Sequence, residues 1–312
     1  MSEPLADGAP RTARAPGVGR ATLLVAFSAC CFGSIAIFVS VATRAGARLV
    51  DVLAWRFLIA ALLLALLAGG PAAIQRELRR GLPLVVLAGG GQAAIGGLSL
   101  SALRYVSAAT MIFLFYTYPA WVTVISALRG KEPLTGRRLV ALALSLAGIA
   151  VMVGLPGTGG ASSAAAPGVL LSLAGALLYA LYIPMIDHFG RGLAPALTAA
   201  FATSGAAVIL TAAALVTGGL AARQPATVWL MILLLAILCT VIAFVAFLRG
   251  LAAIGPVRTA IVSTVEPFWG ALLASVVLAQ PLAPRTLTGG LLVAAAVVIL
   301  NVPQRTHAPA VA

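Results

Sequence analysis

The chain is a succession of apolar stretches of about twenty residues each, separated by short segments rich in glycine, proline and arginine. About twenty helical residues cross the ~30 Å hydrocarbon core of a bilayer. Hydrophobic residues make up 62% of the chain and charged residues only 9%, which is too little polar surface to cover a water-soluble globule. We therefore expect the lipid bilayer to surround most of the chain.

Ten segments are predicted to be membrane-spanning helices. Their limits are 21–43, 49–68, 82–102, 107–128, 137–154, 168–188, 194–217, 227–248, 256–278 and 285–301. The predicted fold class is an all-α polytopic membrane protein with ten transmembrane helices in two inverted five-helix repeats. Residues 1–20 and 303–312 are predicted to be cytoplasmic tails.

The second half of the chain repeats the first at an offset of 148 residues. Matched pairs include Pro119 with Pro267, Trp121 with Trp269, and Arg137 with Arg285. This duplication predicts a first repeat over 21–155 and a second over 166–302. Because five helices is an odd number, the second repeat must enter the bilayer from the opposite face. Inverted repeats of this kind rock around a central site in many secondary transporters.

The basic residues predict the orientation of the chain. The net charge is +13, but the arginines lie in short connections between apolar runs and no basic domain suited to nucleic acid is present. Arginines are most frequent on the side that holds both tails, so we expect the N- and C-termini to be cytoplasmic. One pair of connections runs against this bias, because Arg44 and Arg48 fall outside and only Arg191 falls in the matching inner loop.

Several other classes of site are not expected. Cys30, Cys31 and Cys239 lie within apolar spans, where they behave as small buried residues. No cluster has metal-ligand spacing, and no phosphate-binding loop that would drive transport with ATP is present. The sequence thus predicts no metal, no cofactor and no enzymatic activity. The Asp187-His188 pair is interpreted as a surface pair, with a proton relay as the alternative.

Four motifs follow one another along the chain. They are the Arg56-Phe57 pair in the second helix, a proline in the fourth and ninth helices, KEPLTGRR from Lys131 to Arg138, and STVEPFWGALLASVVL from Ser263 to Leu278. Together they resemble the EamA-type transporters of the drug/metabolite transporter superfamily. The resemblance implies a carrier for small metabolites, often amino acids or their derivatives and often moved outward. It also implies a central cavity formed by helices three, four, eight and nine together with one and six.

Glu266 is the strongest candidate site residue. It lies about ten residues into the ninth helix, near mid-bilayer, where an ionised carboxylate is unfavourable unless it is paired or hydrated. One hypothesis is that Glu266 exchanges a proton during the transport cycle. The structural alternative is a hydrogen-bonded Glu266 that fixes the kink at Pro267.

Arg56 is the second charged candidate. It lies roughly 10 Å below the outer end of the second helix, where it needs a carboxylate, backbone carbonyls or the headgroup region as partner. It is predicted either to orient an anionic substrate group, or pair with Glu266, or to extend outward toward the headgroups. Asp51, nearer the surface, is interpreted as a helix cap.

The two helix prolines mark related positions in the repeats. Tyr118 precedes Pro119 as Glu266 precedes Pro267. Each proline removes a backbone donor, which frees the carbonyl of Phe115 or Ser263 for substrate, water or a neighbouring hydroxyl.

Further aromatic and polar side chains are candidates to line the cavity: Gln92, Phe113, Tyr116, Tyr179, Tyr182 and Trp269. On a continuous helix Tyr116 and Tyr118 point about 200° apart, so only one of them is expected to face the centre. Helical spacing places Phe113 on one face with Tyr116, Tyr179 with Tyr182, and Trp269 with Glu266. As a group the candidates favour an organic substrate with an apolar part.

The sequence therefore predicts a secondary transporter that exports small organic metabolites across the inner membrane by alternating access, with proton coupling as a hypothesis. A lipid-precursor flippase is the alternative, suggested by Arg56 and Arg104. An intramembrane enzyme would need a second deep carboxylate, and a structural or sensory protein would show no flux. Substrate, direction, coupling ion and oligomeric state stay open.

Overall fold

The computed structural model describes residues 17–102, 104–106, 108–130, 135–153, 166–279 and 284–301. Within these ranges the chain forms helices joined by turns and short irregular segments, without any β-strand. The prediction of an all-helical protein is confirmed for this part of the chain. The tail predicted over 303–312, and most of that over 1–20, lies outside the described residues.

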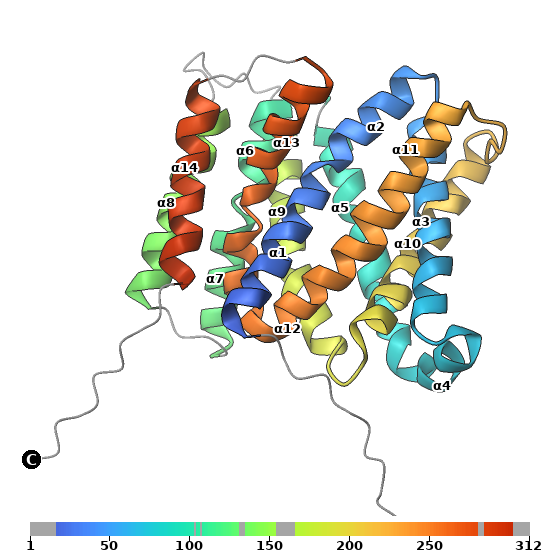
Figure 1. The fold of residues 1–312 in the computed structure, drawn as a ribbon, viewed down its shortest axis with the longest axis horizontal. Coiled ribbons are helices and arrows are strands. Elements are labelled where there is room, and N and C mark those ends of the chain that lie inside the picture. Colours follow the sequence, from blue (N-terminus) through green and yellow to red (C-terminus); the bar gives the residue numbers. More distant parts are fainter. Residues whose placement is uncertain are drawn as a thin grey trace, which may run out of the picture.

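The helices follow one another as coloured in Figure 1. The first half contains α1 (Val18–Gly33), α2 (Ile35–Arg44), α3 (Leu49–Leu67), α4 (Gly70–Pro83), the π-helical turn η1 (Leu84–Ala88), α5 (Gly89–Ala102), α6 (Ala108–Phe115), α7 (Tyr118–Leu128) and α8 (Gly136–Val153). The second half contains α9 (Ala166–Phe189), α10 (Pro195–Val216), α11 (Ala226–Ala236), the π-helical turn η3 (Ile237–Ile242), α12 (Ala243–Val262), α13 (Val265–Val277) and α14 (Pro284–Asn301). Helices therefore occupy all ten segments that were predicted from the sequence.

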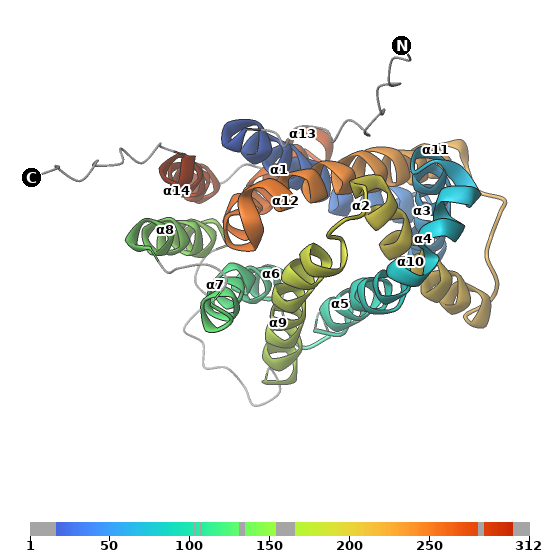
Figure 2. The same ribbon diagram turned by 90° about the horizontal axis from the view of Figure 1, so that it is seen from below.

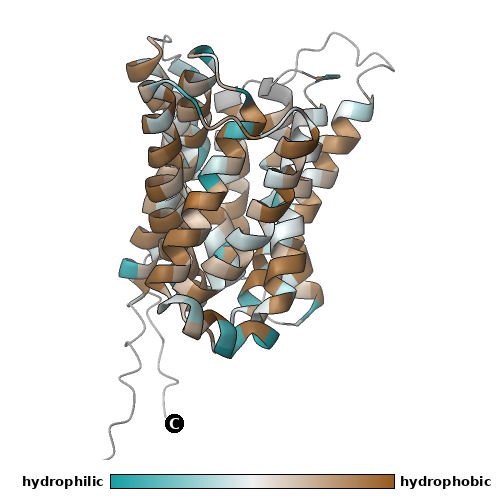
Figure 3. Cartoon of the chain, turned by 90° about the vertical axis from the view of Figure 1, so that its right-hand side faces the viewer, coloured by the Kyte–Doolittle hydropathy of each residue, from teal (hydrophilic) through white to brown (hydrophobic). Residues whose placement is uncertain are grey.

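Within the described residues, six helical stretches are both long and apolar enough to cross a membrane. They are Val18–Arg44, Leu49–Leu67, Gly70–Ser99, Ala166–Phe189, Pro195–Val216 and Ala226–Val262. Large apolar side chains on their flanks are exposed, for example Leu23 and Leu170. Figure 3 shows this hydrophobic surface along the flanks and more polar colours toward the two ends. An apolar belt between polar ends is expected of a protein embedded in lipid.

One of these stretches contains a sharp reversal. Ala226–Val262 is 37 residues long, or about 55 Å as a straight helix, nearly twice the ~30 Å hydrocarbon core. Within it Gly255 has φ 77° and ψ 168°, a conformation that residues with a side chain rarely adopt, and Pro256 follows. The chain turns back here, at the lower end of Figure 1, and rises again into α13.

The two halves run in opposite directions. α1 begins beside Gly250, because the Ala21 carbonyl lies 3.0 Å from the position that a Gly250 side chain would occupy. α9 ends at the same level, because Asp187 lines one cavity with Leu251. The first helix of one half therefore starts where the first helix of the other half finishes, as an inverted repeat requires.

The most extensive helix contacts join the two halves. α3 packs on α10, α8 on α14, α1 on α12, and α5 on α9. At the 148-residue offset, α1 corresponds to α9 and α12 to α5, so the α1/α12 contact is equivalent to the α9/α5 contact. In the other two pairs, α3 corresponds to α10 and α8 to α14, so each pair joins equivalent helices. In the end view of Figure 2, α8 and α14 form one edge of the bundle and α3, α4 and α10 lie toward the other. The two-repeat architecture thus accounts for the packing.

The connection between the second and third predicted spans is itself a helix. α4 carries exposed Arg76, Arg79 and Arg80, while its Ile74 packs against the core. Its last turn fits closely against the bundle, because a side chain at Gly81 would meet the Phe201 ring at 2.3 Å. The sequence analysis predicted no helix here, because the segment is too short and too charged to be a membrane-spanning stretch.

Candidate functional site

Two helix interruptions position the central residues. α6 ends at Phe115 and α7 begins at Tyr118, while α12 ends at Val262 and α13 begins at Val265. The interruptions lie at the same place in the two repeats, just before Pro119 and Pro267. At the second one, the Glu266 N–H donates to the Ser263 carbonyl at 3.0 Å. The sequence predicted that Pro267 frees this carbonyl, but the turn is tight, so the N–H of Glu266, one residue before the usual donor position, reaches it.

Glu266 occupies the first turn of α13 and points at the opposite repeat. The Tyr116 hydroxyl forms a side-chain hydrogen bond with its carboxyl group, and Tyr118, Tyr179 and Cys30 lie within electrostatic range of it. None of the basic side chains in the described ranges forms an ion pair with Glu266. The carboxyl group therefore has a phenol, and not an arginine, as its partner.

Tyrosine rings from both repeats cluster around Glu266. The Tyr118 and Tyr179 rings are 4.7 Å apart, Tyr116 and Tyr118 are 5.9 Å apart, and Tyr182 stacks on Tyr179 at 5.9 Å with an interplanar angle of 16°. Phe115 completes the group at 5.5 Å from Tyr179. These distances are typical of favourable aromatic pairs. Five of the predicted site residues, Glu266 and the four tyrosines, thus lie together.

The expectation that only one of Tyr116 and Tyr118 faces the centre is wrong. Both side chains are buried, with 7% and 1% exposure, and both contact the cluster. The 200° separation assumes a continuous helix. The interruption at Tyr116–Thr117 breaks the helical rotation, so the two rings turn toward the same side.

A cavity of about 50 Å³ adjoins the tyrosine cluster. Its polar lining comes from Arg56 of α3, Gln92 of α5 and Thr240 of η3, beside Tyr179 and Tyr182. Within this lining, the Tyr182 hydroxyl and Gln92 form a side-chain hydrogen bond. A cavity lined by a few such polar groups can accept a polar group of a ligand.

Arg56 is turned into the bundle and is 7% exposed. Its Nε donates to Thr240 Oγ1 at 2.8 Å, its Nη2 donates to the Cys239 carbonyl at 3.5 Å, and the guanidinium carbon lies 4.9 Å from the Phe57 ring centroid. The predicted outward extension and the predicted pairing with Glu266 are both wrong. Arg56 does not extend outward because the π-helical turn η3 brings a hydroxyl and a carbonyl to its guanidinium.

Thr240 is a site residue that the sequence did not indicate. Its hydroxyl donates to the Leu235 carbonyl five residues earlier at 2.8 Å and accepts from Arg56. π-helical turns are frequent at functional sites because they reorient side chains within a helix. Gln92 and Thr240 are related by the 148-residue offset, a relation that could have identified Thr240 from the sequence.

Trp269 faces α1 and α2 and not the cavity. Its Nε1 donates to Ser34 Oγ at 3.0 Å, where α1 and α2 are interrupted. The same region is packed backbone to backbone, since a side chain at Gly33 would lie 2.5 Å from the Glu266 carbonyl oxygen. Trp269 and Gly33 therefore fix where α13 sits. The side chain of Phe113, also predicted for the cavity, lies outside the described part of the chain.

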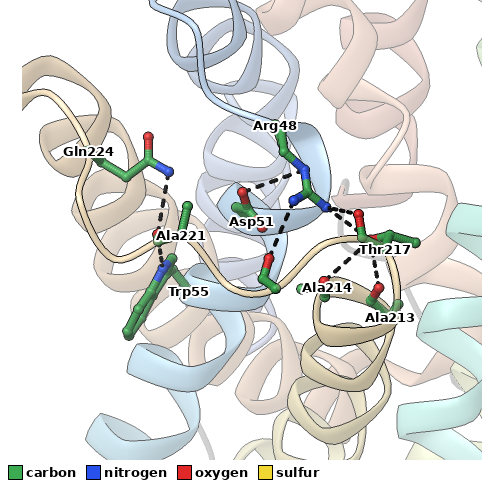
Figure 4. Close-up of polar contacts among 9 residues, drawn as sticks. Arg48, Asp51, Trp55, Ala213, Ala214, Thr217, Ala221 and Gln224 are labelled. Carbon is green, nitrogen blue, oxygen red and sulfur yellow. Dashed lines mark hydrogen bonds and ion pairs between the residues drawn. The ribbon is translucent and has the colours of Figure 1, made fainter.

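At the opposite end from the Gly255 turn, Arg48 ties α3 to the α10–α11 connection (Figure 4). It donates to the carbonyls of Thr217 at 2.9 Å and Gly219 at 3.3 Å, and lies 3.7 Å from Asp51. Asp51 is not a helix cap, because it sits in the first turn of α3, 1% exposed, and both its oxygens lack hydrogen bonds. The positive charge of Arg48 compensates the buried Asp51 carboxylate.

We expect Arg48→Gln to destabilise the fold by about 1 kcal/mol, because it removes the hydrogen bonds and leaves the Asp51 carboxylate buried without a cation. Thermal unfolding in detergent measures this change. The Arg48→Gln/Asp51→Asn double variant should be more stable than the single variant. Equal stability of the two would contradict an interaction between these side chains.

Asp187 pairs with Arg191 and not with its neighbour His188. The ion pair measures 2.9 Å, while the His188 ring packs on Phe189 at 5.1 Å. No group of three or more potential metal-ligating side chains occurs among the described residues.

Comparison with known proteins agrees with this architecture. The model of the EamA-like transporter family matches residues 19–154 and again residues 166–302. A solved structure described as "Crystal structure of protein" has a TM-score of 0.74 at 20% sequence identity, covering 91% of this chain and 96% of the other, a likeness of fold. No curated protein matches the sequence. The two family matches cover most of the chain, which therefore belongs to the EamA-like transporters, multi-pass membrane proteins of the drug/metabolite transporter type.

Proposed function

We propose that this protein exports small organic metabolites, such as amino acids or their derivatives, across the inner membrane by alternating access. The observation that carries the proposal is the cluster of Glu266, Tyr116 and Tyr179, which joins a carboxyl group to phenols from both repeats between the two halves of the bundle. Because its groups come from both repeats, relative movement of the repeats opens and closes it.

The size of the adjoining cavity supports a nearly closed conformation. About 50 Å³ holds one or two water molecules, since water occupies about 30 Å³ in the liquid. An amino acid enters only after the repeats separate. The tyrosine rings then offer an apolar surface, while Arg56, Gln92 and Thr240 offer polar contacts for the substrate.

The proposed topology has ten membrane-spanning helices, with repeats over 21–155 and 166–302 and both tails in the cytoplasm. Arginines at the end where α1 begins support this orientation by the positive-inside rule. In the described ranges this end carries Arg20, Arg76, Arg79, Arg80, Arg129, Arg137, Arg138, Arg191, Arg249 and Arg258, whereas the other end carries Arg44, Arg48, Arg104, Arg223 and Arg285. The inward turn of Arg56 removes one of the two features that suggested a flippase.

We further propose that Glu266 couples export to protons. A carboxyl group without a basic partner inside a membrane protein is neutral when protonated and poorly stabilised when ionised. Among the described residues, the Tyr116 hydroxyl is its hydrogen-bond partner. Proton release to one side and uptake from the other would then accompany movement of the repeats.

The test measures uptake of radiolabelled amino acids and small amines into inside-out vesicles, with and without an imposed proton gradient. We expect one substrate to show gradient-dependent flux that Glu266→Gln loses, because the amide cannot exchange a proton. Glu77→Gln is the matched control, since Glu77 lies on α4 beside Arg80 and should not affect flux. Gradient-dependent flux that is unchanged in Glu266→Gln would refute the coupling role, and absence of flux for every compound would refute the proposed export.

A further inference from the structure

The helix α4 extends beyond the membrane-spanning part of the bundle. The helical stretch Gly70–Ser99 is 30 residues long, or about 45 Å, which exceeds the ~30 Å hydrocarbon core by about 15 Å. The excess lies in α4, because all four charged residues of the stretch precede Pro83. Figure 1 shows α4 at the lower end of the bundle, the end where α1 begins. By this length, α4 lies at the level of the lipid headgroups.

The fold fixes the position of α4. Gly69 and Gly70 have φ of 105° and 76°, a left-handed conformation that residues with a side chain rarely adopt, and Pro71 follows at the start of the helix. At its other end α4 continues through η1 into α5. On its inner side Ile74 packs against the core. The sides of α4 that face away from the bundle are therefore presented in a defined direction.

α4 exposes apolar side chains next to its packed side. Leu78 and Leu82 are 48% and 54% exposed. They follow Ile74 at intervals of four residues, so they form one strip that begins at the packed edge of the helix and turns outward. An amphipathic helix at the boundary between headgroups and acyl chains covers such leucines with lipid. The strip therefore suits a helix that lies against a lipid surface.

The remaining side of α4 is basic. Arg76 and Arg79 are exposed, and neither forms an ion pair within the described residues. Their spacing of three residues places them on one side of the helix, away from Ile74. Arg80 lies 3.3 Å from Glu77, so its charge is partly compensated. Two uncompensated positive charges thus lie beside the strip of exposed leucines.

The second repeat has no counterpart of this basic helix. At the 148-residue offset, Arg76 corresponds to Gln224 and Arg79 to Thr227. Residues 217–225, which take most of the place of α4 at the other end of the bundle, are not helical. An irregular loop is therefore sufficient to join the two spans. The helix and its charges belong to one end of the bundle and are not required by the repeat.

We propose that α4 binds anionic phospholipids at the membrane surface where α1 begins. Arg76 and Arg79 contact the headgroup phosphates, and Leu78 and Leu82 lie against the outer part of the acyl chains. Arginine forms charge-assisted hydrogen bonds with phosphate oxygens, and the negative surface potential of anionic lipids adds to them. The leucines favour a lipid over a soluble phosphate compound, which would leave them in water. Because α4 continues into α5, bound lipid also holds a helix that lines the central cavity.

The test is native mass spectrometry of the purified full-length chain in a non-ionic detergent, titrated with phosphatidylglycerol or with phosphatidylcholine. The apparent Kd of the first bound lipid is measured for each. We expect phosphatidylglycerol to bind about 25-fold more tightly, because each of two arginines contributes about fivefold at an anionic lipid surface. Arg76→Gln/Arg79→Gln should lose this preference.

Two further double variants sharpen the test. Arg44→Gln/Arg223→Gln is the matched control, because it removes two exposed arginines from the opposite end of the bundle, and its preference should equal that of the unmodified protein. Leu78→Gln/Leu82→Gln should weaken binding of both lipids about tenfold, because it removes the apolar strip. The replaced side chains are all exposed, so the unfolding temperatures of the three variants should match that of the unmodified protein.

Four results would overturn the proposal. They are equal affinity for the two lipids, an unchanged preference in the α4 arginine variant, an equal loss of preference in the control, and unchanged lipid binding in the leucine variant. Glycerol 3-phosphate distinguishes a lipid surface from a site for soluble phosphate compounds. If it displaces phosphatidylglycerol at equal concentration, the acyl chains play no part and the proposal is wrong. Because lipid binding is measured without transport, its outcome is independent of the flux experiment with Glu266→Gln.

Discussion

Gly205→Ala is expected to destabilise the fold by about 3 kcal/mol, the upper part of the range for adding a methyl group to a closely packed interior. A side chain at Gly205 of α10 would lie 1.9 Å from the Val85 carbonyl oxygen and 2.9 Å from Gly89 Cα. Both neighbours are backbone atoms in η1 and α5, so no flexible side chain can move aside. The two helices would have to separate.

Thermal unfolding of the purified protein in detergent measures this effect. Gly96→Ala is the matched control, since Gly96 lies in α5 and no atom beyond the helix itself lies within 4 Å of the position that a side chain there would occupy. Alanine is the better helix former by about 1 kcal/mol, so the control should be neutral or slightly stabilising. Equal unfolding temperatures of the two variants would show that α10 is not packed directly against the backbone of η1 and α5 at Gly205.

The glycine clusters show how far sequence reasoning reaches on packing. A triplet such as Gly89-Gly90-Gly91 allows either close helix approach or bending. A side chain at Gly89 would lie 2.5 Å from the α10 backbone and one at Gly91 would lie 3.1 Å from the Tyr182 ring, but one at Gly90 would meet nothing within 4 Å. Glycine content indicates that two helices can pack closely. The glycine that makes the contact depends on where the two helices cross, and a single sequence does not give that position.

The architecture was predictable because the bilayer restricts it strongly. Apolar length, proline positions and the 148-residue offset were sufficient for the helical segments and for two halves of opposite direction. Arginine distribution gave the proposed orientation. The helix α4 was missed because the prediction looked for apolar stretches of about twenty residues, and α4 is a short, charged, amphipathic connection.

The site was less predictable because it depends on departures from regular helix. Tyr116 and Tyr118 face one cluster only because the helix is interrupted between them. Arg56 is bonded inside the bundle only because the π-helical turn at Thr240 presents a hydroxyl group to it. Helical-wheel reasoning assumes that each residue adds about 100° of rotation, and both interruptions violate that assumption.

The residues at the helix interruption of Tyr118 and at the π-helical turn of Thr240 also show how the two repeats differ. The offset pairs Tyr118 with Glu266 and Gln92 with Thr240, so each central position has two members of unlike chemistry. A symmetric backbone thereby holds an asymmetric set of polar groups. Such a set can bind a polar substrate in one orientation, which identical groups in both repeats would not favour.

Arg56→Met is expected to slow substrate flux about 100-fold while making the fold more stable. Arg56 donates to neutral groups, Thr240 Oγ1 and the Cys239 carbonyl, and none of the acidic side chains in the described ranges forms an ion pair with it. An arginine near the centre of a membrane helix is unfavourable by about 3 kcal/mol relative to an apolar residue. Methionine fills a similar volume without that desolvation, which predicts a gain of about 1–3 kcal/mol in unfolding free energy.

The loss of flux follows from the position of the guanidinium beside Gln92 and Tyr182 in the central cavity. Without it, a substrate anion loses charge-assisted hydrogen bonds worth about 3 kcal/mol, equivalent to about 100-fold in binding. Arg56→Lys separates the two effects, because it keeps the buried charge and should gain no stability. Vesicle flux and thermal unfolding are measured on the same three proteins. Unchanged flux in Arg56→Met would show that Arg56 serves only packing. Lower flux together with higher stability would show that Arg56 serves transport and destabilises the fold.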